Sequence, residues 1–427
     1  MLRKWIYNKG QNLRNPTLAE WKQFLVLSET WEKKELYEYQ LKKLKELVSF
    51  AYENSEFYKQ KMLEVSFHPD DLKTLGDIKK LPVLSKETLL SENDRIHTNF
   101  NFGKTFLAST SGSSGNSLSF YREESADSFN RAAAFRGYSW YNVQPWERNG
   151  YFWGFNFSWQ KRIKIGLLDW LQNRFRIFKY DEKEFAAFVK KLQKASYVHG
   201  YSSMIYESAR LINERGLPKP EKLKMVKGTS EKIYENYQDE VLSAFGIRMV
   251  SEYGATESGI IAFECPEGNM HINMEGVIVE EKNNEILVTN LQMKSFPVIR
   301  YKLGDYIELA PEDELCTCGR AHLILKEVTG RIGANVYGVS NTYPSLYFYY
   351  IFKNLSVNHE LKLTYQVIQR EKGQLEFYIA ESLSEFNEAL VRKEIEKYFK
   401  KDISFAIRKL IQKPSNTSKT KSFISYI

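Results

Sequence analysis

Cysteine is scarce in this chain, which has only three among its 427 residues. Three thiols cannot form a framework of disulfides, so we expect a protein of a reducing compartment. No run of about 18 apolar residues occurs, and the sequence therefore predicts no transmembrane helix. The first residues, MLRKWIYNKGQNLRN, lack the apolar segment of a secretory signal. These absences favour a cytoplasmic protein.

Charge of one sign is in only slight excess. The 61 basic residues outnumber the 53 acidic residues, and the formal net charge is +8. Such an excess suits anionic ligands or a membrane surface, but it does not indicate nucleic acid as a partner. Aromatic residues are plentiful, with 27 Phe, 27 Tyr and 8 Trp. The composition is globular, and the length suits roughly two or three domains.

Hydrophobic periodicity predicts a large α/β domain followed by a smaller one. Residues 1–100 show mainly helical spacing. Residues 125–245 alternate short apolar runs with helical patterns, and strand character increases between residues 272 and 331. We expect an α/β N-terminal domain of several subdomains over residues 1–331 and a small α+β C-terminal domain over residues 332–427.

The small domain has clear element patterns of its own. Leu361–Val367 and Leu375–Ile379 are predicted strands, and Glu385–Phe399 is a predicted helix. No internal repeat and no low-complexity tract interrupts the chain.

The stretch STSGSSGN, residues 109–116, consists only of small polar residues between two apolar segments. Its two glycines permit positive φ angles and close approach of a ligand to the backbone. Successive N–H groups, with serine and threonine hydroxyls, can cradle an anion. No Gly-Lys-Ser/Thr closes the stretch, so it is not a Walker A motif. A phosphate-binding loop and a flexible surface loop are equal alternatives on these residues alone.

Further motifs, in the right order along the chain, carry a resemblance. VSEYGATE, residues 250–257, resembles the YGxTE motif of adenylate-forming enzymes, and FPVIRYKLGD, residues 296–305, resembles their RYxxGD motif. VTGR, residues 328–331, resembles their hinge. LPVLSKETL and KGTSEKIYENYQDEVLSAFG are similar to the phenylacetate–CoA ligase-like group, which includes CapK-type relatives from capsular polysaccharide gene clusters. The resemblance extends from about residue 40 to about residue 425.

The resemblance implies a ligase that uses ATP and Mg²⁺ to convert a carboxylic acid to an acyl-adenylate. The acyl group would then pass to CoA, or to a sugar or carrier in polysaccharide assembly. The alternative is a non-catalytic scaffold of a glycan-assembly complex that has kept the fold. A dimer is one possible oligomeric state, and no nucleic-acid partner is implied.

The resemblance also assigns nucleotide-binding residues. The loop predicted to wrap the β and γ phosphates is Ser109, Thr110, Ser111, Gly112, Ser113, Ser114 and Gly115. Other residues predicted to contact the nucleotide are Ser230, Glu231, Tyr253, Gly254, Asp305 and Arg331. Thr256 would donate to the α-phosphate, Glu257 would hold Mg²⁺, and Asp305 would accept the ribose hydroxyls. The alternative for Thr256 and Asp305 is a structural role in turns and caps.

The chain departs from the family pattern near its C-terminal domain. The family often has two acidic residues after the hinge Gly-Arg, and this chain has Gly333 and Ala334 there. The candidate for the catalytic lysine is Lys419, although Ser418 stands where the family has glycine. Lys421 is the second candidate, and a solvated basic tail is the remaining alternative.

The three cysteines can form a metal site with a histidine. Five residues separate Cys265 from His271, and Cys316 and Cys318 follow some 45 residues later. Three thiolates and one imidazole make a closed tetrahedral set for structural Zn²⁺. His322 is a rival for the fourth ligand, and unrelated buried thiols are the alternative to a metal site.

Two aromatic segments remain open to two interpretations each. The aromatic residues between 140 and 159, with a segment at 197–206 that matches the family's carboxylate pocket, would suit an aryl acid or a plain core. Trp159–Phe178 mixes basic and apolar residues. It could lie on the inner face of a membrane as a peripheral contact, or it could pack as an ordinary amphipathic helix.

Overall fold

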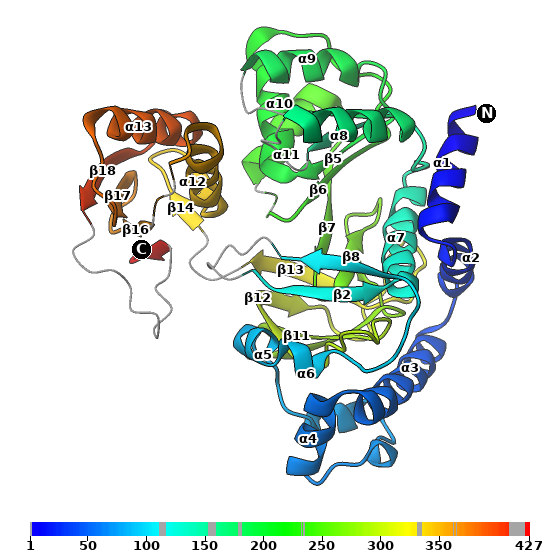
Figure 1. Cartoon of the computed structure of the whole chain (residues 1–427). Helices are drawn as coiled ribbons and strands as arrows, with labels where there is room; N and C mark the ends of the chain where they lie inside the picture. The colour runs from blue at the N-terminus through cyan, green and yellow to red at the C-terminus, as the bar shows by residue number, and fades with distance from the viewer. Residues whose placement is uncertain are drawn as a thin grey trace. The chain divides into compact units, whose positions relative to one another are not determined.

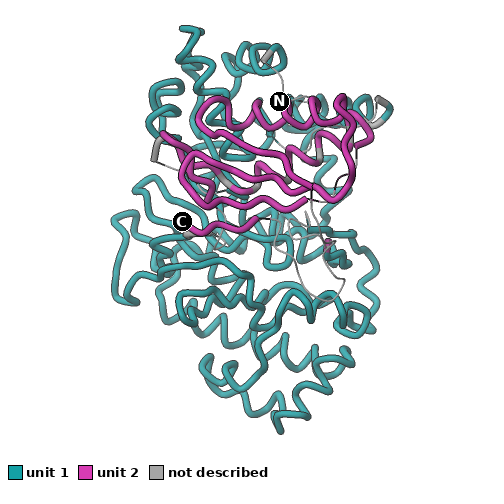
Figure 2. The backbone as a smooth tube through the Cα atoms, turned by 90° about the vertical axis from the view of Figure 1, so that its left-hand side faces the viewer, with its two compact units in different colours: residues 1–110, 118–329 teal, residues 111–117, 330–427 magenta. Residues whose placement is uncertain are grey.

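The computed structural model describes residues 2–110, 117–152, 159–177, 182–231, 233, 235–330, 335–361, 363, 365–409 and 423–427. The chain divides into two compact units (Figure 2). Residues 1–110 and 118–329 belong to the larger unit, and residues 330–427 to the smaller one. The division lies next to the boundary predicted after residue 331.

The first hundred residues are helical, as predicted. The helices are α1 (Leu2–Arg14), α2 (Leu18–Ser28), α3 (Lys33–Asn54), α4 (Glu56–Glu64), α5 (Lys86–Ser91) and α6 (Asn93–Ile96), with short 3₁₀ turns at Pro69–Asp71 and Leu75–Lys80. The face of α3 that carries Leu36, Leu44 and Leu47 is buried in the main core of the larger unit. A hairpin of β1 (Thr105–Ser109) and β2 (Ser119–Glu123) follows.

An eleven-stranded mixed sheet organises the larger unit (Figure 1). Its strands are β3 (Asn149–Phe152), β4 (Arg174–Arg176), β5 (Tyr197–Tyr201), β6 (Met225–Thr229), β7 (Met249–Ala255), β8 (Gly259–Glu264), β9 (Met270–Ile272), β10 (Val277–Lys282), β11 (Glu285–Asn290), β12 (Tyr301–Leu309) and β13 (Ile324–Gly330). The spatial order is β10-β11-β12-β13-β9-β8-β7-β6-β5-β3-β4. Strands β4, β3, β5, β6 and β7 run parallel, and β8 is antiparallel to β7.

Helices precede or connect the parallel strands. These are α7 (Glu124–Ser139), α8 (Trp159–Leu171), α9 (Glu182–Leu192), α10 (Ser202–Arg215) and α11 (Glu235–Phe245). Val198 of β5 and Val226 of β6 pack with α9, α10 and α11 in one hydrophobic cluster. Because side chains alternate along a strand, the flanking residues Tyr197, His199 and Lys227 point to the opposite face.

The smaller unit has its own sheet and core. Its elements are β14 (Asn335–Tyr337), β15 (Thr342–Pro344), α12 (Leu346–His359), β16 (Tyr365–Gln369), β17 (Gln374–Ile379), α13 (Glu385–Phe399), β18 (Ser404–Lys409) and β19 (Phe423–Ser425). The sheet order is β18-β17-β16-β19. Helix α13 and strand β17 match the predictions closely, whereas the strand predicted at Leu361–Val367 lies over Tyr365–Gln369.

Candidate functional site

Two motif residues far apart in the sequence meet at the carboxyl end of the parallel strands. Tyr253 lies near the end of β7, and Asp305 lies in β12. The Tyr253 hydroxyl donates to Asp305 Oδ2 at 2.8 Å. In open α/β sheets this edge is where ligands bind. The structure therefore brings together two of the residues that were predicted to contact the nucleotide.

The residues after Tyr253 turn into β8. Gly254 lies so close to this strand that a Cβ at its position would be 2.5 Å from the Gly259 carbonyl oxygen. The turn thus requires glycine for steric reasons, independently of any nucleotide. The Thr256 carbonyl accepts a hydrogen bond from the Arg122 guanidinium.

Glu257, the predicted Mg²⁺ ligand, is a buried carboxylate that is 5% exposed. Its Oε1 lies 3.3 Å from the donating hydroxyl of Tyr301. Asn290 donates from its side-chain amide to the carbonyl oxygen of Glu257. These contacts hold the carboxylate in place beside the turn, and an oriented carboxylate is the kind of oxygen donor that Mg²⁺ prefers.

The glycine-serine stretch joins the two strands of the β1–β2 hairpin. The Ser109 and Ser119 hydroxyl oxygens are 2.8 Å apart. The Thr110 N–H donates to the Leu118 carbonyl, and the Leu118 N–H donates to the Thr110 hydroxyl, both at 2.9 Å. The predicted phosphate-binding residues Ser111, Gly112, Ser113, Ser114 and Gly115 lie outside the described residues, as do Arg331, Lys419 and Lys421.

Glu231 has a local contact that the sequence did not predict. Its Oε2 accepts the Ser203 backbone N–H at 2.8 Å in the first turn of α10, and Ser230 before it has a φ of 68°. Burial raises the pKa of Glu231 to about 7. Its Oε1 is buried and has no hydrogen-bond partner within the described part of the chain. The predicted contact of Ser230 and Glu231 with the nucleotide remains a prediction.

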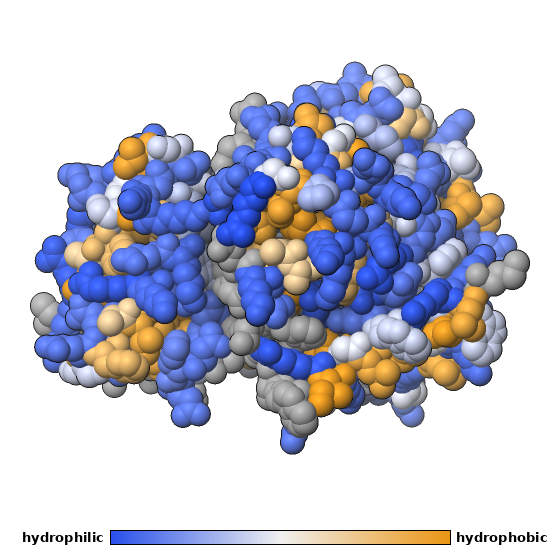
Figure 3. Space-filling model, turned by 90° about the horizontal axis from the view of Figure 1, so that it is seen from above, coloured by the Kyte–Doolittle hydropathy of each residue, from blue (hydrophilic) through white to orange (hydrophobic). Residues whose placement is uncertain are grey.

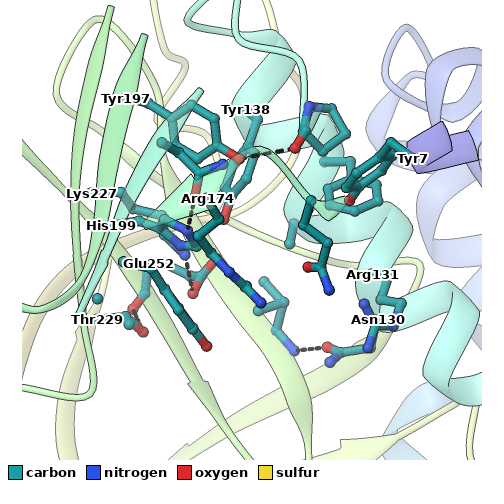
Figure 4. A pocket seen from close by; sticks show the side chains of 18 of the residues that line it. Tyr7, Asn130, Arg131, Tyr138, Arg174, Tyr197, His199, Lys227, Thr229 and Glu252 are labelled. Atoms are coloured by element: carbon teal, nitrogen blue, oxygen red, sulfur yellow. Dashed lines mark hydrogen bonds and ion pairs between the residues drawn. The ribbon is translucent and has the colours of Figure 1, made fainter. Parts of the chain in front are cut away.

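A cavity of about 330 Å³ lies against the face of the sheet opposite α9, α10 and α11 (Figure 4). Helices α1 and α7 contribute to its walls, and Gly200, Thr229 and Glu252 bring it to the carboxyl ends of β5, β6 and β7. Glu252 directly precedes Tyr253 in β7, so the cavity lies next to the motif along the strand, although Tyr253 and Asp305 are not among the residues that line it.

The floor of this cavity is a row of polar side chains across four strands. Strand register places Tyr151, His199 and Lys227 side by side on β3, β5 and β6, and Arg174 of β4 also lines the cavity. The rings of Tyr151 and His199 stack with centroids 4.6 Å apart. The guanidinium groups of Arg174 and Arg176 lie 4.4 and 4.9 Å from the Tyr151 ring centroid.

His199 is neutral in this surrounding. Burial, together with the nearby charges of Lys227, Arg174 and Arg176, lowers the pKa of His199 far below its usual value. Its Nδ1 lies 3.3 Å from the Tyr138 hydroxyl oxygen, and its Nε2 lies 3.3 Å from Asn149 Oδ1. The neutral imidazole is held by these two polar neighbours, and it adds no positive charge to the cavity floor.

Two buried carboxylates balance most of the positive charge of Lys227, Arg174 and Arg176. Lys227 Nζ lies 2.6 Å from Glu252 Oε1, and Asp169 binds both Arg174 and Arg176 at 2.8 and 2.5 Å. The second oxygen of Glu252, Oε2, is buried and lacks a hydrogen-bond partner among the residues that the structure describes. A buried unpaired oxygen is costly, so an occupant of the cavity that donates a hydrogen bond would be stabilised there.

The predicted metal ligands converge as a compact group. Ligand atoms of Cys265, His271, Cys316 and Cys318 all lie within 4.8 Å of one another. The Cys265 and Cys316 sulfurs are 3.7 Å apart, and Cys318 Sγ lies 3.1 Å from His271 Nε2. This donor set and its closeness fit a tetrahedral zinc site.

The structure separates the two candidate histidines. His271 Nδ1 lies 3.3 Å from the His322 carbonyl oxygen, which directs Nε2 toward the cysteines. Burial lowers the pKa of His271 to about 4, so the imidazole is neutral, as a metal ligand must be. His322 Nε2 instead lies 3.1 Å from Glu275, whose carboxylate also binds Arg136. The geometry thus favours His271 over His322.

Similarity to known proteins agrees with the motifs. No protein-family model matches the chain. Protein CapK of Staphylococcus aureus is 24% identical over 322 residues, which cover 70% of this chain and 68% of that protein. Phenylacetate-coenzyme A ligase of Thermus thermophilus is 24% identical over 385 residues, which cover 82% and 81%.

The fold is shared with a solved acyl-CoA ligase. The structure of 2-hydroxyisobutyryl-CoA ligase with 2-HIB-AMP and CoA in the thioesterification state aligns with a TM-score of 0.63 at 17% identity, covering 93% of this chain and 91% of that one. The open conformation of the same ligase gives a TM-score of 0.60 and covers 93% of each chain. In sequence the chain is thus similar to CapK and to a phenylacetate-coenzyme A ligase, and it shares the fold of an acyl-CoA ligase, in agreement with the adenylate-forming motifs.

Proposed function

We propose that the protein is an AMP-forming ligase that activates a carboxylic acid with ATP and transfers the acyl group from the adenylate to an acceptor. The meeting of Tyr253 and Asp305 beside a polar cavity at the carboxyl ends of the strands carries this proposal. Such a site can hold a nucleotide and an acid next to each other, so that one carboxylate oxygen attacks the α-phosphate and pyrophosphate leaves.

Each residue has a distinct part in the proposed reaction. Asp305 binds the ribose hydroxyls, and Tyr253 orients Asp305 while its ring lines the adenine site. Thr256 donates to the α-phosphate, and the phosphate loop from Ser109 to Gly115 supplies N–H and hydroxyl donors. Glu257 would hold Mg²⁺, which when bound neutralises phosphate charge.

The direct test is acid-dependent pyrophosphate release from ATP and Mg²⁺, with and without CoA. Release that requires an acid supports the ligase. No release with any acid, from folded protein that also fails to bind ATP, would favour the non-catalytic scaffold instead. Release that continues on addition of CoA, with formation of a thioester, would identify CoA as the acceptor.

The Asp305→Ala variant is expected to bind AMP more weakly by about 1.5–3 kcal/mol, because it removes two charge-assisted hydrogen bonds to ribose. The corresponding loss of affinity is roughly 10- to 150-fold, and calorimetric titration measures it. Glu308→Ala, at an exposed position of the same strand, is the matched control and should bind normally. An unchanged affinity for Asp305→Ala would refute the assignment.

The acid that enters the cavity is expected to be small and polar rather than aryl. Glu252 Oε2 would remain without a hydrogen-bond partner against an apolar group. Acids that carry a hydroxyl group able to donate to Glu252 should therefore support faster pyrophosphate release than phenylacetate, by at least about tenfold in kcat/KM. A clear preference for phenylacetate would show that the polar floor does not select the substrate.

The acceptor and the biological setting form the finer part of the proposal. A role in polysaccharide assembly is supported by the similarity to CapK, and an acceptor other than CoA would be a sugar or carrier. Transfer assays from a preformed adenylate to CoA and to amino sugars distinguish the two.

A further inference from the structure

Two helices of the larger unit expose large hydrophobic side chains to solvent. Trp5 is 60% exposed, Leu167 60% and Trp170 57%. The full set, called here the α1–α8 face, is Leu2, Trp5 and Leu13 on α1 and Ile163, Leu167, Leu168 and Trp170 on α8. Figure 3 shows hydrophobic side chains gathered along the edge of the larger unit, among hydrophilic ones.

Helix α8 buries a charged side chain and exposes apolar ones, which is the opposite of an ordinary core helix. Among its described side chains, the one that is buried is Asp169, at 4% exposure, and it is held there by Arg174 and Arg176 of β4. Helix α1 has no buried residue at all. Within the Trp159–Phe178 segment, the large apolar side chains Ile163, Leu167, Leu168 and Trp170 of α8 are thus exposed, whereas Phe175 and Ile177 beyond the helix pack in the core.

The two helices are joined to each other, so their exposed residues form one surface. Arg3 Nη1 donates to the Trp170 carbonyl at 2.7 Å, and the Arg3 guanidinium lies 4.6 Å from the Trp170 ring centroid. Helices α1 and α8 also lie next to each other.

Positive charge surrounds the apolar residues. Helix α1, LRKWIYNKGQNLR, contains no acidic residue, and Lys9 Nζ lies 5.0 Å from the Trp5 ring centroid. Lys164 is exposed on α8, and the acidic residue of that helix, Asp169, is buried and paired. The α1–α8 face thus combines leucine and tryptophan with cations and presents no exposed carboxylate on these helices.

We propose that the α1–α8 face docks on the surface of an anionic lipid bilayer. Tryptophan and leucine side chains enter the headgroup boundary, while lysine and arginine side chains extend to the lipid phosphates. The helices lie along the surface, in keeping with the finding that no helix of the described residues is long and apolar enough to cross a membrane. Membrane docking would hold the proposed cavity near acceptors that are themselves bound to lipid.

The test is co-sedimentation of the full chain with vesicles of phosphatidylcholine alone and with added phosphatidylglycerol. We expect binding to the anionic vesicles that weakens as salt is raised. No binding to phosphatidylglycerol vesicles would overturn the proposal. Equal, salt-independent binding to both vesicle types would overturn it as well, because the charges would then have no part.

Two variants separate the contributions of the face. Lys9→Gln combined with Lys164→Gln should weaken binding by roughly 10- to 30-fold. Trp5→Ser combined with Leu167→Ser should abolish it, and both variants should keep the wild-type circular dichroism because the residues are exposed. Leu315→Ser combined with Lys59→Gln, at exposed positions outside this face, is the matched control and should bind like wild type.

The same variants identify a competing occupant. If the wild type forms a dimer that Trp5→Ser with Leu167→Ser dissolves, and neither protein binds vesicles, a second copy of the chain covers this face. That result would replace the membrane proposal. The lipid assays need no ATP or acid, so their outcome is independent of whether the ligase activity is confirmed.

Discussion

Protein purified without added metal is expected to contain about one zinc ion per chain, bound by Cys265, His271, Cys316 and Cys318. The ligand atoms of these residues already lie within 4.8 Å of one another. They lie directly after β8, in β9 and in the segment before β13, so a metal there would tie three parts of the chain together. Its binding free energy would then stabilise the fold directly.

Cys316→Ser is expected to lose the zinc and more than about 4 kcal/mol of stability, a range reached when a metal site is lost. Elemental analysis and chemical unfolding measure the two effects. His271→Asn should also lose the metal, whereas His322→Gln should retain it, because His322 Nε2 lies against Glu275. Loss of zinc from His322→Gln but not from His271→Asn would reassign the fourth ligand. A wild-type protein that is fully stable without metal would refute the predicted zinc site.

The second large effect is expected on the rate of adenylation when Lys419 is replaced. Lys419→Ala should lower acid-dependent pyrophosphate release by roughly 10²–10³-fold, the scale for losing one electrostatic donor in the transition state. The lysine would contact the α-phosphate and carboxylate as charge develops there and hardly at all in the ground state. The loss should therefore appear in kcat more than in KM.

Transfer of the acyl group from a preformed adenylate should change much less in the same variant, because the donor acts in the first half reaction. Lys421→Ala is the matched control, two residues along the same segment. If Lys421→Ala loses pyrophosphate release and Lys419→Ala keeps nearly the wild-type rate, Lys421 is the catalytic lysine. If both retain full rates, neither lysine has a part in adenylation.

Sequence alone was sufficient for features that depend on a local residue pattern or on the order of motifs along the chain. Helix α13 lies at Glu385–Phe399 as predicted, and the Ser384 hydroxyl caps it by accepting the Asn387 N–H at 3.2 Å. The adenylate-forming family could be identified because its motifs occur in a set order, and sequence relatives and fold agree with that identification.

Contacts between distant segments needed the tertiary structure. The bond between Tyr253 and Asp305 joins residues of two strands that are not neighbours in the sheet. The choice of His271 over His322 depends on which ring nitrogen faces the cysteines. The polar cavity floor arises because strand register aligns Tyr151, His199 and Lys227, and no local pattern encodes that alignment.

Helix α8 shows most clearly what the sequence alone cannot predict. Its sequence, WQKRIKIGLLDWL, mixes basic and apolar residues, and this pattern is the same for a core helix and for a surface helix. Sequence alone determined that the segment is amphipathic. Tertiary structure decided which side is covered, because Arg174 and Arg176 of the adjacent strand bind Asp169 and pull the polar side inward. Burial depends on which neighbours arrive from elsewhere in the chain, so an apolar stripe predicts a contact without specifying its partner.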